Sequence, residues 1–65
     1  MCEANAYLVK GNDNVLLMES VDSVSPSENG LLLVNIFGEQ KFIKGYIESL
    51  SLVDHKIYLK EHPKG

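Results

Sequence analysis

The chain contains a single cysteine, no arginine and no long apolar run. One cysteine excludes an internal disulfide, and no cluster of cysteine and histidine residues supplies the four ligands of a structural zinc site. Nucleic-acid-binding proteins usually present a basic face on which arginine contacts phosphates and guanine. Here all six basic residues are lysines and the formal net charge is −3, so the composition argues against a nucleic-acid partner.

The first residues of the chain carry neither the basic nor the apolar region of a secretory signal. No apolar stretch approaches the roughly 18 residues that are needed to cross a membrane. A lone thiol without a pairing partner also fits a reducing compartment better than an oxidising one. The sequence therefore predicts a cytoplasmic protein that has no membrane partner.

Sixty-five residues predict one small domain that spans residues 1–65. A chain of this size buries only about 60% of the surface that its unfolded form exposes, so its core is marginal. Disulfides and structural metals are the usual supports of small folds, and this composition provides neither. We therefore expect the chain to associate with a second copy of itself.

Turn signals recur at short intervals, and the segments between them have the composition of strands. The turn clusters lie at residues 11–14 and 25–30, around Gly38 and at 54–56. The intervening segments predict five strands, at residues 2–10, 15–24, 31–36, 40–52 with a bend at Gly45, and 56–60. This pattern predicts an all-β fold, a small antiparallel five-stranded meander or barrel. A helix over residues 46–53 is the alternative, because apolar residues there also recur at helical spacing.

Apolar residues alternate along the first and last predicted strands, as expected where one face is buried. Cys2, Ala4, Ala6 and Leu8 share one face of the first strand. The segment Leu31–Ile36 differs because it is apolar on both faces, and such a strand needs cover on both sides. A 65-residue chain has little material for a second cover, so we expect a partner subunit to supply it.

Cys2 has two interpretations. It is either a small core residue next to the two alanines or a metal ligand. Its thiolate and its backbone nitrogen can close a five-membered chelate ring, and two chains related by a two-fold axis would offer two such sets. A planar set of nitrogen and sulfur donors suits Ni(II) or Cu(II) better than tetrahedral Zn(II). Ala4 and Ala6 have no bulk that would keep two first strands apart.

The remaining candidate ligands are weaker. His55 lies in a predicted turn, and His62 lies in the carboxyl-terminal tail, so we expect both to be solvated. A nucleophilic dyad of Cys2 and His55 would need an orienting group and a pocket, for which the fold has little room. We therefore expect the protein not to be an enzyme. At Phe37–Glu39 we expect a turn with Gly38 at positive φ and with Phe37 buried.

The three tyrosines could stack on nucleic-acid bases if they shared one face, although tyrosines in small barrels are more often surface or interface residues. They are Tyr7, Tyr46 and Tyr58. The sequence alone leaves both interpretations open.

Three segments together resemble the CooT family of small nickel-binding proteins, which is named for an accessory protein of carbon monoxide dehydrogenase maturation. These segments are Met1–Ala4, Ile36–Lys41 and His55–Ile57. The resemblance implies a homodimeric small β-barrel, similar to SH3 or Sm-like folds. It also implies one Ni(II) ion per dimer, held by Cys2 of each chain, and an activity as a nickel chaperone for a nickel enzyme or its maturation proteins.

Two other hypotheses compete with nickel binding. One is a small SH3-like or Sm-like module that binds RNA or a protein partner, using the tyrosines with Lys41 and Lys44. The other is a structural interaction domain that docks through Leu31–Ile36.

Overall fold

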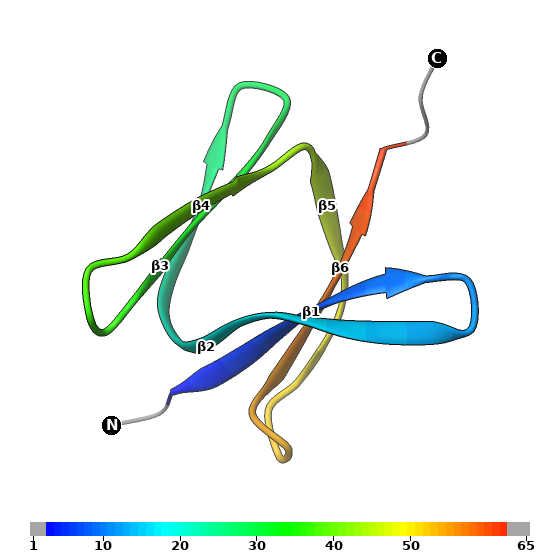
Figure 1. The fold of residues 1–65 in the computed structure, drawn as a ribbon, viewed down its shortest axis with the longest axis horizontal. Helices are drawn as coiled ribbons and strands as arrows, with labels where there is room; N and C mark the ends of the chain where they lie inside the picture. Colours follow the sequence, from blue (N-terminus) through cyan, green and yellow to red (C-terminus); the bar gives the residue numbers. More distant parts are fainter. Residues whose placement is uncertain (1–2, 63–65) are drawn as a thin grey trace.

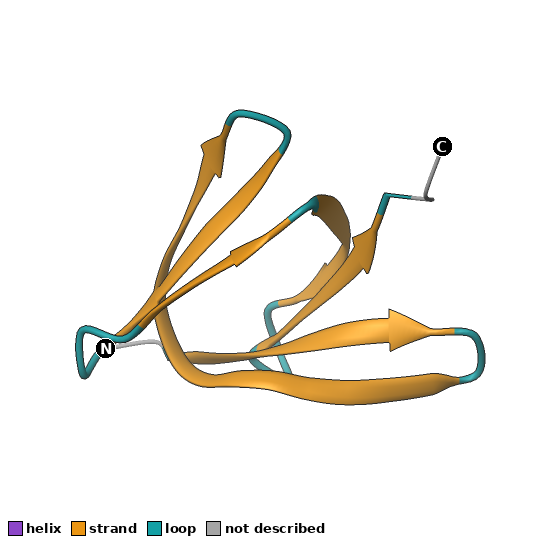
Figure 2. Cartoon of the chain, turned by 45° about the horizontal axis from the view of Figure 1, so that its top comes forward, coloured by secondary structure: helices purple, strands orange, loops and turns teal. Residues whose placement is uncertain are grey.

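Six β-strands make up the part of the chain that the computed structural model describes, residues 3–62, and they form one strongly curled sheet (Figures 1 and 2). Within that range there is no helix that is long and apolar enough to span a membrane. The strand order across the sheet is β4-β3-β2-β1-β6-β5. The strands are β1 (Ala4–Lys10), β2 (Asp13–Ser27), β3 (Gly30–Asn35), β4 (Gln40–Ile43), β5 (Gly45–Ser51) and β6 (Lys56–Glu61).

The expected all-β architecture is confirmed, and the helical alternative for residues 46–53 is wrong because β5 occupies most of that segment. The expected bend at Gly45 is confirmed as well, and it divides the predicted fourth strand into β4 and β5. A Cβ atom at Gly45 would collide with the backbone carbonyl of Lys60 on β6. Only glycine therefore allows the chain to leave one edge of the sheet and approach the other so closely.

One strand pair departs from the expected antiparallel pattern, because β1 and β6 run parallel. The chain reverses direction four times, at the turns that follow β1, β2, β3 and β5, and it continues through the bend between β4 and β5 (Figure 1). An even number of reversals leaves β6 pointing the same way as β1. The parallel pair joins the two ends of the chain inside the sheet and leaves β4 and β5 at its edges.

The core lies on the concave face of the curled sheet. Ala6 and Leu8 point into it from β1, and their register partners Ile57 and Leu59 do so from β6, as the alternation predicted. Burying an aliphatic side chain of this kind contributes about 1.5–3 kcal/mol. The other buried apolar residues are Met18, Val21, Leu33 and Ile43.

The strand β3 is apolar on both faces, and the two faces have different surroundings. Leu33 is completely buried in the core, and Leu31 packs against that core. On the opposite face, Leu32 and Val34 are half-buried, and Leu32 is paired with the exposed Phe42 of β4. The second apolar face is therefore only partly covered by residues 3–62.

Candidate functional site

The predicted metal ligand Cys2 lies outside the described residues, and the strand that follows it, β1, begins at Ala4. Among residues 3–62, no three histidine, cysteine, aspartate or glutamate side chains gather in a way that could hold a metal ion. Neither His55 nor His62 therefore belongs to a cluster of three candidate ligands in that part of the chain. A site that involves Cys2 would combine its thiolate with donors from the rest of the chain or from a second chain.

Two hydrogen bonds hold Asn5 at the start of β1. Its backbone N–H donates to the carbonyl of His55 at 2.9 Å, and its side-chain Oδ1 accepts from the backbone N–H of Ser20 at 3.2 Å. The register explains the second bond: one residue separates Ala4 from Ala6 on β1, whereas two residues separate their partners on β2. This β-bulge interrupts the ladder, and the Asn5 amide supplies an acceptor where the backbone does not.

The hydrogen bonds that begin at Asn5 continue through Ser20 to the β3–β4 turn. Ser20 has a φ of 55°, which is unusual for a residue other than glycine, and its carbonyl accepts a hydrogen bond of 3.0 Å from the N–H of Ile36. The start of β1 is therefore tied to the β5–β6 turn on one side and to the β3–β4 turn on the other. Asn5 is the residue at which the two connections meet.

The β5–β6 turn exposes an apolar surface beside the start of β1. Leu50 near the end of β5 and Leu52 and Val53 in the turn, which we call the hairpin-tip surface, are all exposed, and the last two reach 82% and 90% exposure. A small cavity of about 190 Å³ lies next to them, and Ala4 contributes to its wall. Such exposure of large aliphatic side chains in one place is typical of a protein interface. His55 lies in this turn with a φ of 56° and an exposed side chain, as a turn residue would.

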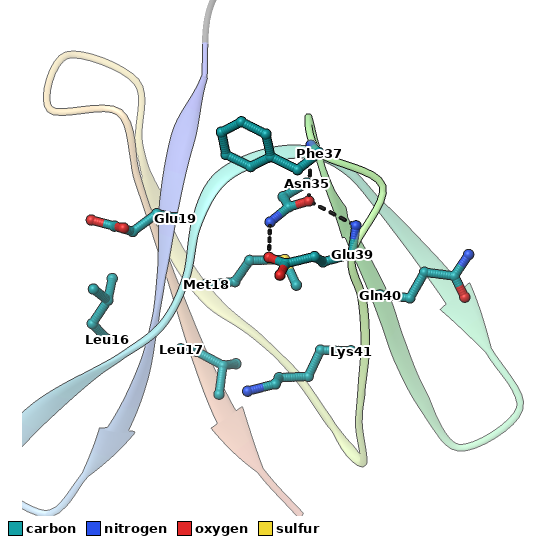
Figure 3. Close-up of a pocket in the computed structure, with 9 residues that line it drawn as sticks. All are labelled: Leu16, Leu17, Met18, Glu19, Asn35, Phe37, Glu39, Gln40 and Lys41. Atoms are coloured by element: carbon teal, nitrogen blue, oxygen red, sulfur yellow. Dashed lines mark hydrogen bonds between the residues drawn. The ribbon is translucent and has the colours of Figure 1, made fainter.

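The β3–β4 turn is built around the buried side chain of Asn35 (Figure 3). Its Oδ1 accepts hydrogen bonds from the backbone N–H groups of Phe37 and Glu39, at 3.0 and 2.9 Å, and its Nδ2 donates to Glu39 Oε1 at 2.7 Å. The predicted positive φ of Gly38 is confirmed at 86°. The predicted burial of Phe37 is wrong, because the Asn35 amide fills the interior of the turn and leaves the ring 75% exposed.

The tyrosines do not form one continuous stack. Tyr7 and Tyr58 are register partners on β1 and β6, and their rings are stacked with centroids 5.8 Å apart. The ammonium group of Lys56 lies 5.7 Å from the centroid of the Tyr7 ring. Tyr46 instead packs against the imidazole of His62, with centroids 5.6 Å apart.

Sequence reasoning missed the positions that organise this region. Asn35 could have been found, because it is the one polar residue in the apolar run 31–37, and a buried amide must find hydrogen-bond partners. Asn5 and Ser20 gave no comparable signal. Their contact depends on a register shift between two strands that the sequence does not mark.

Comparison with known proteins agrees with this geometry. The family model of CooT, the carbon monoxide dehydrogenase accessory protein, matches residues 1–60. The crystal structure of a protein assigned as CooT from Carboxydothermus hydrogenoformans is 50% identical in sequence, with a TM-score of 0.90, and the match covers 95% of this chain and all of that one. An uncharacterized protein of Methanothermobacter thermautotrophicus is 35% identical over 60 residues, which cover 92% of this chain and 89% of that protein.

Proposed function

Because this chain belongs to the CooT family of carbon monoxide dehydrogenase accessory proteins, we propose that it binds nickel as a homodimer and delivers or stores the ion for maturation of that enzyme. Cys2 of each chain is the proposed metal ligand. The observation that supports this proposal most directly is the hairpin-tip surface next to the start of β1. A two-fold contact through that surface would bring the two amino-terminal segments together.

The donor chemistry fits this proposal. Residues 3–62 contain no cluster of three candidate ligands, and the donors proposed for each copy are the Cys2 thiolate and nearby backbone nitrogens. Two copies double that set to two sulfurs and at least two nitrogens. Softer ligands of this kind, arranged in a plane, suit Ni(II) better than the hard oxygen-binding ions Mg²⁺ and Ca²⁺. We infer that the site is completed only when two chains associate.

Native mass spectrometry with Ni(II) tests the proposal. We expect the wild-type dimer to take up one nickel ion for every two chains, with absorption bands from thiolate-to-metal charge transfer. The Cys2→Ala variant should remain dimeric and lose both the ion and the bands. The His55→Ala variant is the matched control and should retain them. Tight nickel binding by Cys2→Ala would overturn the proposal.

The stacked pair of Tyr7 and Tyr58 beside Lys56 favours a second candidate, a module that binds single-stranded RNA by base stacking. The net charge of −3 argues against it. This candidate predicts that the protein retains a short oligouridine in a filter-binding assay and that Tyr58→Ala abolishes the retention. It also predicts that Cys2→Ala leaves RNA binding unchanged.

A further inference from the structure

The long strand β2 has a free edge over half of its length. Its residues Asp13 to Val21 pair with β1 on one side, but β3 joins the other side only from Val21 onward. On the side away from β1, the stretch Asp13–Glu19 therefore has no strand partner among residues 3–62. Alternate residues there direct their backbone N–H and C=O toward the open side, as at any sheet edge, and a bulge at Leu17 shifts this alternation by one residue.

A groove of about 650 Å³ lies alongside this free edge (Figure 3). Leu16, Leu17 and the buried Met18 line it from β2, and Figure 3 shows the side chain of Lys41 reaching across from β4 toward Leu17. The exposed ring of Phe37 lines one end of the groove, on the turn that Asn35 holds. The groove is thus apolar along residues 16–18 of β2 and charged at Glu19, Glu39 and Lys41, and its far wall is fixed by hydrogen bonds to a buried side chain.

An extended polypeptide fits these features better than a helix or a small molecule. Unpaired backbone groups at strand spacing are satisfied by the backbone of an added strand, whereas a helix has already used its own N–H and C=O groups. Alternate side chains of an added strand point to one face. Those side chains would enter the groove and contact Leu17, Met18 and Phe37.

The charges at the ends of the free edge indicate which strand would bind. Asp13 and Glu19 flank an uncharged, mostly apolar centre. A second copy of the chain, paired antiparallel about Leu16, would place Asp13 opposite Glu19 of that copy, and like charges in directly opposite positions are destabilising. We propose that the free edge of β2 and its groove bind an extended apolar segment of a partner protein that has a basic residue at each end.

A synthetic seven-residue peptide, with lysine at each end and alternating valine and threonine between them, tests this proposal by amide NMR on the full chain. We expect chemical-shift changes confined to Asp13–Glu19 and to the groove residues 37–41. A peptide with glutamate at both ends loses two exposed charge pairs and should bind about two- to thirtyfold more weakly. A peptide with proline at its centre should not bind, because proline lacks the N–H that the edge requires.

Two variants separate this edge from a general effect of charge. Glu19→Lys should abolish the preference between the lysine-ended and glutamate-ended peptides, because one acidic and one basic end then remain. Glu48→Lys makes the same charge change on β5, which is also an edge strand, and should leave the preference unchanged. Shift changes centred on β4 or β5, equal binding of the proline peptide, or no shift at about 1 mM peptide would each overturn the proposal. None of these outcomes depends on nickel or on Cys2.

Discussion

The side-chain carbonyl of Asn5 accepts a hydrogen bond from the backbone N–H of Ser20, at 3.2 Å, across the bulge between β1 and β2. Because the N–H of Asn5 also donates to the carbonyl of His55, one residue links β1 both to β2 and to the β5–β6 turn. This arrangement fixes the direction from which the chain enters the sheet, three residues after the proposed nickel ligand. A short polar side chain at this position therefore contributes to the fold at the start of β1.

Replacing Asn5 with alanine should destabilise the protein by about 1 kcal/mol, because the N–H of Ser20 loses its acceptor at an interrupted point of the ladder. Urea denaturation followed by circular dichroism measures this change. Asn5→Asp keeps an acceptor oxygen in the same place and should cost less than Asn5→Ala. An unfolding free energy that is the same in Asn5→Ala and in the wild type would show that water satisfies Ser20 equally well.

Replacing Asn35 with alanine should cost at least about 2 kcal/mol, because it removes three hydrogen bonds from the interior of the β3–β4 turn. The exposed Asn14→Ala variant on β2 is the control and should stay within about 0.5 kcal/mol of the wild type. Thermal unfolding of the two variants compares them directly. Equal melting temperatures would mean that the amide of Asn35 does not hold the turn.

A charge on the hairpin-tip surface should separate the proposed dimer into folded monomers. Leu52→Asp places an unpaired carboxylate in the contact, and burying such a charge costs several kcal/mol, so the dimer dissociation constant should rise about tenfold or more. Multi-angle light scattering over a dilution series measures it. Val15→Asp, at an exposed position on β2, should leave the dimer intact. A dimer that persists in Leu52→Asp would place the contact elsewhere.

The Leu52→Asp variant should also lose nickel uptake, because the proposed site needs Cys2 from both chains of the dimer. Equilibrium dialysis with Ni(II) after the light-scattering measurement tests this coupling. A folded monomer that still binds one nickel ion per chain would contradict a shared site without contradicting nickel binding itself.

The sequence alone determined the class of the fold and most of its strands. The alternation of Ala6 and Leu8 with polar neighbours, and that of Ile57 and Leu59, decided which faces are buried, because the side-chain period of a strand is two. Gly45 marked the bend, since no larger residue could approach the carbonyl of Lys60 so closely. The resemblance in three short segments identified the family and, with it, Cys2 as the expected nickel ligand.

Only the tertiary structure decided which distant residues meet. The parallel pairing of β1 with β6, the contact of Asn5 with Ser20 and the placement of the β5–β6 turn beside the start of β1 all depend on register and on sheet curl. Local patterns do not record these features, because each joins positions separated by at least fifteen residues. Phe37 makes the same point, since its neighbours in sequence predict burial, whereas the amide of Asn35 takes the interior position and leaves the ring in solvent.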